Sequence, residues 1–323
     1  MHTPQIDNHE VGAPRSRSRA LEVLLFGEVL ADVYPDRRMP GGAPFNVGCH
    51  LAACGVPVAL VSRLGFDSLG DFLQMALARS GIGPGFVQRD PEHASGHVDV
   101  IATTQGHRFE IVPDQAFDFI DGTILRDDLL RGQVQPRLIY FGTLAQRNSA
   151  SRMALDTLLA ACDATRFVDL NLRPPWISGD VVEKSLTAAN IIKLSEEELR
   201  SIAPMLELFP EAGDEAIARQ LAQRFAIDMI VVTCGARGAW CLYGELVQRV
   251  AAVPANTTEG DAVGAGDAFS ACCIRGHLLH WVRPSTLDRA AAFAAAICGI
   301  RGPVPESSQF YSRFKKAWRL EHN

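Results

Sequence analysis

The heptapeptide Asp261-Ala-Val-Gly-Ala-Gly-Asp267 leads directly into an apolar stretch that runs from Ala268 to His280. Apolar or small residues recur at positions i, i+3, i+4 and i+7 from Phe269, which predicts a helix. The heptapeptide puts two glycines and two alanines where this helix begins. Backbone N–H groups are unpaired at a helix N-terminus and the helix dipole is positive there, so the stretch predicts an anion-binding site.

Asp267 stands at the same point of the chain. A carboxylate beside an anion site is unfavourable unless a proton must leave a nucleophile while negative charge builds next to it. Phosphoryl transfer to a hydroxyl needs this combination. The alternative is a glycine-rich turn between a strand and a helix, capped by the aspartate, since short glycine motifs often carry no function.

The composition sets the class of protein. The chain has 323 residues, of which 47% are hydrophobic, so it can bury a large core in one large or two modest domains. A formal net charge of -6 gives no electrostatic reason to expect a nucleic-acid partner. The eight cysteines never form C-x-x-C and mostly lie in apolar runs, which indicates free thiols and a cytoplasmic location.

We expect neither a secretion signal nor a membrane-spanning segment in this sequence. Residues 1–20 are polar, contain an Arg-Ser-Arg-Ser-Arg run and lack the apolar segment of a secretion signal, so we expect a disordered extension before a domain over 21–323. A basic docking tail is the alternative. The longest apolar run, Ala290 to Ile300, is too short to span a bilayer, so we expect no membrane partner.

Short apolar, β-prone runs alternate with helical patterns along the chain. This order predicts an α/β fold with a mostly parallel sheet that is covered by helices on both faces. Helices are expected at 45–54, at 214–225 and at 286–299, the last capped by Ser285 with Asp288 three places on. Strands are expected at 22–27, 57–63, 138–141, 166–170, 190–194, 228–233 and 239–243.

Two segments, about 29–40 and 96–112, interrupt this alternation. In the second, Val98, Val100 and Ala102 share one side and Gln105-Gly106 makes a turn, which predicts a hairpin. Small sheets that leave a main domain often cover a substrate or pair with a second subunit. We therefore expect a lid, through which a homodimer is plausible.

Polar residues gather where predicted strands end and helices begin. The stretch Gly41-Gly-Ala-Pro-Phe-Asn46 precedes a helix, and its glycines allow a ligand to approach the backbone closely. Glu28 and Asp32 follow the first strand, where carboxylates face the usual ligand crevice and can accept hydrogen bonds from sugar hydroxyls. An ordinary glycine turn and a loop acid are the alternatives.

Three further groups of polar residues can be interpreted either as local structure or as parts of a binding site. Asp169, Asn171 and Arg173 would share one side if their strand continued, and would suit a polar substrate or a phosphate. Ser195 and Glu198 have the spacing of a capping box, which leaves Glu198 able to order water around Mg²⁺. The turn Thr233-Cys-Gly-Ala-Arg-Gly238 could lie against a nucleotide. The motifs of P-loop NTPases, zinc proteases and α/β-hydrolases are absent from the sequence.

Taken together, the order and spacing of these motifs resemble the ribokinase-like, or PfkB, family of carbohydrate kinases from about Leu21 to Pro305. The resemblance rests on GGAPFNVGCHLAACG from residue 41, VSRLGFDSLGD at 61–71 and DAVGAGDAFSA at 261–271. GEVLADVYPD, FEIVPDQAFDFI and DLNLRPPW look most like the fructokinase-type branch. The resemblance implies a doubly wound three-layer α/β/α domain with a small β-strand lid, and ATP-dependent phosphorylation of a sugar hydroxyl with Mg²⁺.

The resemblance also assigns roles by position. It implies that Asp267 is the catalytic base and that the backbone around it forms the anion hole. It places the sugar near the first glycine motif and the nucleotide near the turn at 233–238 and the late helix. The implied residues are the backbone N–H groups of Ala265, Gly266 and Asp267 for the anion hole, with Gly264 in the same catalytic motif, Asp32, Gly41, Gly42, Asn46 and Arg173 for the substrate, and Thr233, Gly235, Gly238, Ala291 and Cys298 for the nucleotide.

Glu198 is implied in the Mg²⁺ shell through water, and Asp261 with the Val263 carbonyl as ligands of a monovalent cation such as K⁺. Three positions depart from the family pattern. Ala262 stands where a threonine is usual, Ser195 where an asparagine is usual, and Ala291 where an asparagine is frequent.

The expected function is therefore phosphorylation of fructose or a related ketose. Within the same reaction, the alternatives are a nucleoside, a 2-keto-3-deoxy acid or a sugar phosphate as acceptor. Asp32 favours a neutral polyol, because an anionic acceptor would normally meet added lysine or arginine. From another class of protein, the three departures suggest a sugar-binding regulator that has lost catalysis, against which the intact run from Gly264 to Asp267 argues.

Overall fold

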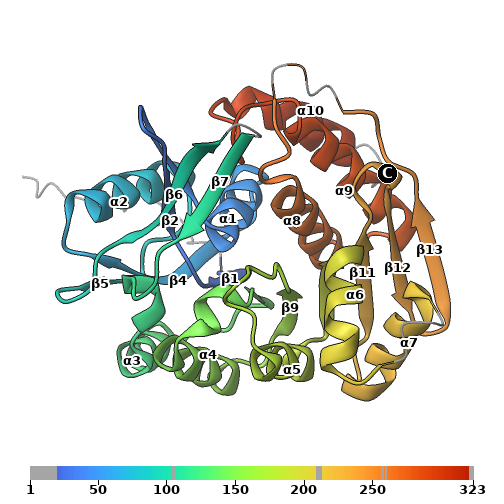
Figure 1. Ribbon diagram of the computed structural model, residues 1–323, viewed down its shortest axis with the longest axis horizontal. Helices are drawn as coiled ribbons and strands as arrows, with labels where there is room; N and C mark the ends of the chain where they lie inside the picture. Colours follow the sequence, from blue (N-terminus) through green and yellow to red (C-terminus); the bar gives the residue numbers. More distant parts are fainter. Residues whose placement is uncertain (1–19, 104–105, 209–212, 256–257, 259, 320–323) are drawn as a thin grey trace, which may run out of the picture.

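The computed structural model describes residues 20–103, 106–208, 213–255, 258 and 260–319. Its main sheet has nine strands in the spatial order β13-β12-β11-β10-β9-β8-β1-β4-β5 (Figure 1). Neighbours pair in parallel from β5 to β11, and β12 is antiparallel to both β11 and β13. The strands are β1 (Val23–Phe26), β4 (Val58–Gly65), β5 (Val87–Asp90), β8 (Leu138–Phe141), β9 (Thr165–Asp169), β10 (Ile191–Ser195), β11 (Met229–Thr233), β12 (Ala239–Tyr243) and β13 (Leu246–Val250).

A second sheet of four strands lies in the order β3-β2-β6-β7. Its central strands β2 and β6 are parallel, and the outer pairs β2–β3 and β6–β7 are antiparallel. The predicted hairpin is thus present, whereas Gln105 of its predicted turn lies outside the described residues, as does the extension predicted before residue 20. The strands are β2 (Leu30–Val33), β3 (Arg38–Gly41), β6 (Gly96–Thr103) and β7 (Gly106–Ile111).

Helices cover both faces of the main sheet. Side chains of β1 alternate between two buried clusters, with Leu24 and Phe26 in one and Val23 and Leu25 in the other. The first cluster contains residues of α3 to α7 and the second contains residues of α1, α2, α8, α9 and α10, which confirms the three-layer fold. The helices are α1 (Ala43–Ala53), α2 (Ser68–Ser80), α3 (Gly122–Gly132), α4 (Ser149–Ala161), α5 (Gly179–Ala188), α6 (Glu196–Met205), α7 (Asp214–Phe225), α8 (Ala265–Leu278), α9 (Arg283–Ile297) and α10 (Ser308–Arg319).

Two local expectations were wrong. The late helix α9 begins at Arg283 rather than after Ser285, because Pro284 fits the first turn of a helix, and Val282 is its N-cap residue. Strand β9 ends at Asp169, and Asn171 has a left-handed φ of 42°. The alternation that would have aligned Asp169 with Asn171 and Arg173 therefore does not persist.

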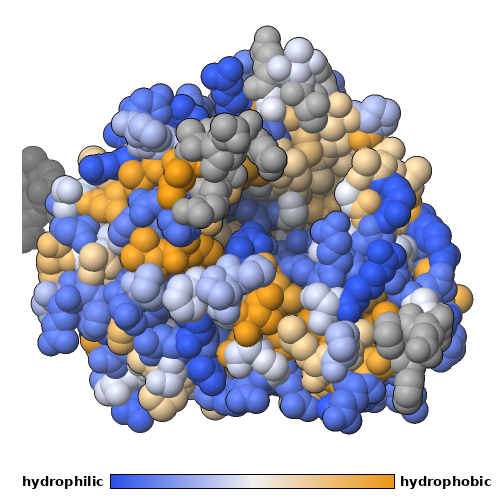
Figure 2. Space-filling model, in the orientation of Figure 1, coloured by the Kyte–Doolittle hydropathy of each residue, from blue (hydrophilic) through white to orange (hydrophobic). Residues whose placement is uncertain are grey.

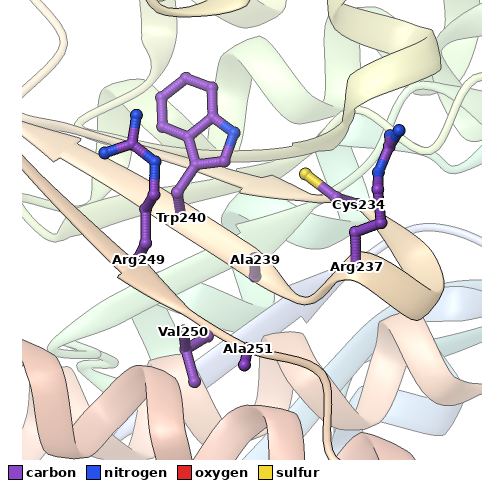
Figure 3. A pocket seen from close by; sticks show the side chains of 7 residues that line it. All are labelled: Cys234, Arg237, Ala239, Trp240, Arg249, Val250 and Ala251. Carbon is purple, nitrogen blue, oxygen red and sulfur yellow. The ribbon is translucent and has the colours of Figure 1, made fainter.

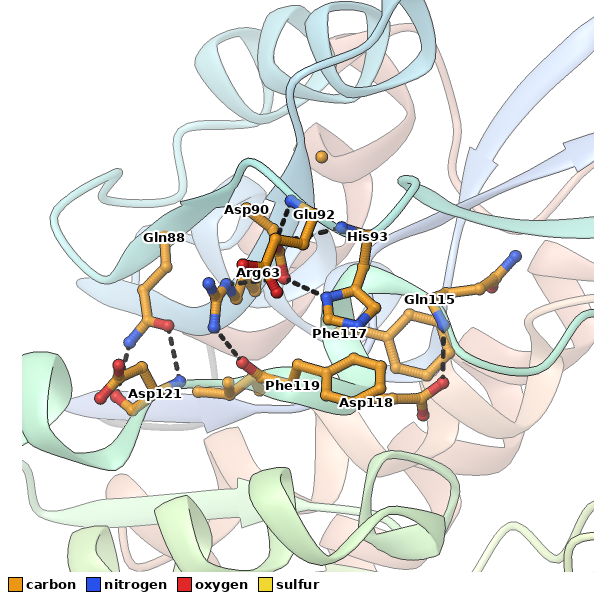
Figure 4. A network of polar contacts seen from close by, with 12 residues as sticks. Arg63, Gln88, Asp90, Glu92, His93, Gln115, Phe117, Asp118, Phe119 and Asp121 are labelled. Carbon is orange, nitrogen blue, oxygen red and sulfur yellow. Dashed lines mark hydrogen bonds and ion pairs between the residues drawn. The ribbon is translucent and has the colours of Figure 1, made fainter.

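The connection between the two sheets is held by a polar network (Figure 4). The Arg63 guanidinium on β4 lies 3.0 Å from the Asp90 carboxylate at the end of β5, and it also donates to the Phe119 carbonyl. His93 Nδ1 lies 3.0 Å from the same carboxylate, and its ring stacks on Phe119 with 3.6 Å between centroids. These contacts fix the segment from which β6 leaves the main domain.

All eight cysteines are free. Over the described ranges, the chain has no helix that combines the length and the apolar character needed to cross a membrane.

Candidate active site

The sheet topology defines where a ligand crevice should lie. From the pair β1 and β8, the strand order runs outward through β4 and β5 on one side and through β9, β10 and β11 on the other. Ligands of doubly wound sheets bind outside the carboxyl ends of the strands at such a switch point. Figure 2 shows a hollow with a hydrophilic floor between the small sheet and the main domain.

Helix α8 brings its N-terminus to this crevice. Gly264 is the N-cap residue, with φ +78°, and no side chain caps the helix. Across the described residues, the N–H groups of Gly266 and Asp267 have no hydrogen-bond partner, whereas Ala268 N–H already bonds Gly264 O at 2.9 Å. The first turn of α8 therefore presents free donors and the partly buried Asp267 carboxylate at one point.

Asn46 joins the first glycine motif to this helix. Its Nδ2 donates to Asp267 Oδ2 at 2.8 Å, and its backbone N–H donates to Gly42 O at 2.9 Å in the first turn of α1. Asn46 is buried, and its Oδ1 has no partner among the described residues. A buried amide oxygen without a donor is costly, so this atom is suited to accept a hydrogen bond from a bound hydroxyl.

Glu28 fixes the turn that starts α1. Its Oε1 accepts a hydrogen bond from Ala43 N–H at 3.2 Å. This N–H lies in the first turn of α1 and therefore has no partner within the helix. Gly42, the N-cap residue, has φ +103°, and a Cβ there would lie 2.6 Å from the Glu28 carbonyl oxygen. Only glycine fits this conformation and this space, which accounts for the second glycine of the motif.

Three carboxylates of this region have raised pKa values. Burial, with a smaller effect of Asp267, raises the pKa of Glu28 to about 7. Burial also raises the pKa values of Asp32 and Asp267 to about 6 each. The Arg173 guanidinium opposes all three increases, so it faces the same group of acids. Asp32 in turn lies against the glycine motif, since its Oδ2 is 3.3 Å from the position of a Cβ on Gly41.

A buried ion pair that the sequence interpretation missed lies under the anion site. Lys193 Nζ on β10 is 3.0 Å from both carboxylate oxygens of Asp169 at the end of β9. Ser270 Oγ on α8 donates to Asp169 Oδ2 at 2.8 Å. Lys193 is the single charged residue in the apolar strand IIKLS, and a lysine in a central strand must be paired. That signal was available in the sequence.

Glu198 forms the predicted capping box. Its Oε2 accepts from Ser195 N–H at 2.7 Å while Ser195 Oγ accepts from Glu198 N–H at 3.1 Å, and its Oε1 accepts from Leu172 N–H at 2.6 Å. The described part of the chain contains no cluster of three or more His, Cys, Asp or Glu side chains able to hold a metal ion. Each Glu198 oxygen keeps a free lone pair, so this residue fits contact with Mg²⁺ through water but not a closed protein cage.

Asp261 connects two loops at the start of α8. Its Oδ1 accepts from Val263 N–H at 3.0 Å, its Oδ2 accepts from Gly302 N–H at 3.4 Å, and its N–H donates to Ile300 O at 3.2 Å. A carboxylate oxygen is a donor that a hard monovalent cation takes, so Asp261 could serve as one ligand of the cation that the resemblance implies.

The predicted nucleotide turn lines a pocket of about 360 Å³ (Figure 3). Thr233 ends β11, a short 3₁₀ helix spans Gly235–Arg237, and Gly238 precedes β12. None of the five residues assigned to the nucleotide lines this pocket. Thr233, Gly235 and Gly238 are chain neighbours of lining residues, whereas Ala291 lies on α9 and Cys298 is its C-cap residue. The lining residues are Cys234, Arg237, Ala239, Trp240, Arg249, Val250 and Ala251.

A larger cavity, about 1090 Å³, opens at the opposite edge of the sheet, where Thr165, Asn190 and Met229 mark the beginnings of parallel strands. None of the predicted site residues line it. The chemistry-bearing residues converge at the crevice instead.

Comparisons with known proteins agree with this fold. The model of the pfkB family carbohydrate kinases matches residues 21–308. A fructokinase of Vibrio alginolyticus is 29% identical over 270 residues, which cover 77% of this chain and 81% of the relative. The fold is similar to the crystal structure of a Xylella fastidiosa fructokinase with bound ATP, with a TM-score of 0.76, 22% identity and coverage of 92% and 99% of the two chains.

A fructokinase of Vibrio cholerae O395, solved with fructose, ADP and calcium ion bound, has a TM-score of 0.71 and 26% identity over 90% of this chain and 98% of its own. The fold and the family model together define a sugar kinase. The chain belongs to the pfkB family of carbohydrate kinases.

Proposed function

We propose that this protein is an ATP-dependent sugar kinase whose acceptor is fructose or a related ketose. The observation that carries the proposal is the hydrogen bond from Asn46 to Asp267, because it puts a carboxylate, an unpartnered amide oxygen and the free N–H groups of α8 at one point. A hydroxyl bound there would meet a base on one side and an anion-binding helix end on the other.

In the proposed step, the sugar hydroxyl oxygen forms a bond to the γ-phosphorus of ATP while the bond from that phosphorus to the β–γ bridging oxygen breaks. Asp267 takes the hydroxyl proton, and the products are ADP, the sugar phosphate and a proton. The free N–H groups of Gly266 and Asp267 receive the charge that spreads over the transferred group, and Ala265 N–H joins them when it leaves the Ala262 carbonyl, which it bonds at 3.3 Å. Bound Mg²⁺, reached by Glu198 through water, would neutralise phosphate charge.

The acceptor is assigned from the charges in the crevice. Glu28, Asp32 and Asp267 all face Arg173, and the other cation near Asp267 is Lys193, which is paired with Asp169. This excess of carboxylates suits a neutral polyol that donates hydrogen bonds. Arg63 is committed to Asp90 and the Phe119 carbonyl, so it is not available for an acceptor phosphate. Fructokinases among the relatives support the choice of a ketose.

We assign the remaining roles to the parts of the molecule around the crevice. The four-stranded sheet would act as a lid that excludes water, which otherwise competes as an acceptor. The pocket beside Thr233, Gly235 and Gly238 would take part of the nucleotide, with Ala291 to Cys298 on a neighbouring side. Asp261 and the Val263 carbonyl would bind K⁺.

The test is an assay of ADP release over a panel that includes fructose, other hexoses, ribose, a nucleoside, 2-keto-3-deoxygluconate and fructose 6-phosphate. We expect ATP- and Mg²⁺-dependent turnover that is fastest with a neutral ketose. Faster turnover with an anionic acceptor would overturn the acceptor assignment. The absence of turnover with every acceptor, together with measurable sugar binding, would favour the regulator over the kinase.

A further inference from the structure

The buried ion pair of Lys193 and Asp169 lies beneath the first turn of α8, next to the proposed anion site. A Cβ built on Gly266 would lie 3.2 Å from Lys193 Nζ, so the ammonium directly underlies the residue whose N–H faces the crevice. Any side chain at this position would meet the ammonium. The lack of a side chain at Gly266 therefore leaves room for the lysine.

Lys193 has donor capacity that its partner does not use. Its side chain is 8% exposed, and Asp169 occupies two of its three N–H bonds. Among the described residues, Asp169 is the one hydrogen-bond acceptor of this ammonium, which leaves its third N–H for a ligand. Burial alone would lower the pKa of Lys193, but the carboxylates of Asp169, Glu198 and Asp267 raise it, so the group stays charged.

Asp169 is held from several sides and so fixes the lysine. Ser270 Oγ on α8 donates to its Oδ2 at 2.8 Å, and Tyr140 OH on β8 lies 3.4 Å from the same oxygen. The network thereby ties β8, β9, β10 and α8 together. Buried ion pairs contribute little net stability, because desolvation offsets the attraction, and stability alone is thus a weak reason for this arrangement.

We propose that Lys193, positioned by Asp169, supplies a fixed positive charge beneath the anion hole and stabilises the phosphoryl group during transfer. The inference rests on the proposed kinase function. The charge acts at the transferred phosphoryl rather than at the sugar, since the sugar-facing groups Asp32 and Asn46 make no contact with Lys193 among the described hydrogen bonds. Lys193 stays protonated throughout, so no proton or bond is exchanged with it.

The test uses the double variant Lys193→Met, Asp169→Asn, which removes both charges together and leaves neither partner buried and unpaired. The control is Lys184→Met, Asp156→Asn, a pair on the surface with 3.7 Å between charged atoms. We expect the first variant to fold and to keep the KM for sugar within about twofold, while kcat falls about 100-fold, as for the loss of one donor to a developing oxyanion. The control should match the wild type.

A second readout does not depend on turnover. In calorimetric titrations, the double variant should bind ADP as the wild type does and bind ATP about tenfold more weakly, because the lost charge faces the γ-phosphate. A kcat within about threefold of wild type, or an unchanged ratio of ATP to ADP affinity in a folded variant, would overturn the inference. If the wild type transfers phosphate to no acceptor, the proposed function fails, while the affinity ratio still tests the lysine.

Discussion

Asn46 Nδ2 lies 2.8 Å from Asp267 Oδ2, and this hydrogen bond joins residues that are 221 positions apart in the sequence. It connects the first turn of α1, which follows the first glycine motif, to the first turn of α8, where the anion site is proposed. A donor to a carboxylate favours its ionised form. The bond therefore keeps the proposed base ready to accept a proton although burial favours its neutral form.

The first prediction concerns the base. Asp267→Asn should bind sugar as the wild type does, because the side chain keeps its size and polarity, but kcat should fall by about 10²- to 10⁴-fold. Steady-state assays of ADP release together with sugar titration calorimetry check this. Asp288→Asn, an exposed position on α9, is the matched control. Near-normal turnover of Asp267→Asn would remove the residue from its role.

The second prediction concerns pH. Burial raises the pKa of Asp267 to about 6, and a base acts only when deprotonated, so kcat/KM should fall as the pH falls through about 6. Asn46→Ala removes the hydrogen bond that lowers this pKa, so the acidic limb should move to higher pH. Sugar KM should also rise, since Asn46 Oδ1 is lost. A pH–rate profile with the same midpoint in both proteins would contradict the assignment.

The third prediction concerns folding stability. Burial raises the pKa of Glu28 from 4.5 to about 7, so the folded protein binds this proton more tightly than the unfolded chain. The associated stability is present below about pH 4.5 and is lost as the pH rises through about 7.

Glu28→Gln keeps the acceptor for Ala43 N–H but removes the buried charge. The variant should therefore have a free energy of unfolding about 3 kcal/mol higher than wild type at about pH 8, with the difference shrinking near pH 5. Urea denaturation at the two pH values measures this. A variant that is less stable than wild type at about pH 8 would show that the charge is compensated.

The fourth prediction concerns the glycine turn. Gly42→Ala should lower the free energy of unfolding by about 1–3 kcal/mol and raise the sugar KM, because φ is +103° and the new Cβ would contact the Glu28 carbonyl. Gly179→Ala is the control, since a Cβ there meets nothing within 4 Å. Thermal unfolding and sugar titration follow both changes. Equal stability of the two variants would contradict the strain argument.

The central strands were predictable because they are buried on both faces and read as continuous apolar runs, as in LIYF at β8 and AWCLY at β12. Both of these strands match their predicted bounds. Strands β5 and β13 were missed because VQRD and LVQRV lie at the edges of the sheet and contain polar residues that break the apolar pattern, buried or half-buried in β5 and partly exposed in β13.

The glycine motifs of the site were predictable because their spacing reflects backbone demands that few other residues meet. The partnership of Asp169 with Lys193 was not, because the register of two strands decides it, with Lys193 directly opposite Asp169 in the β9–β10 pairing. Asp169 was instead assigned to a polar face with Asn171, whose left-handed φ no local pattern announced. Where two distant charges meet is set by topology rather than by local sequence.

The small sheet and the glycine turn are not separable parts. Gly41 is the last residue of β3 and also the first glycine of the turn that leads into α1, and its partner across the strand pair is Leu30, two residues before Asp32. A rotation of the sheet about the main domain would therefore move Asp32, Gly41 and the start of α1 together. We therefore expect that exchanging this sheet between relatives would change the proposed sugar contacts and the proposed closure together.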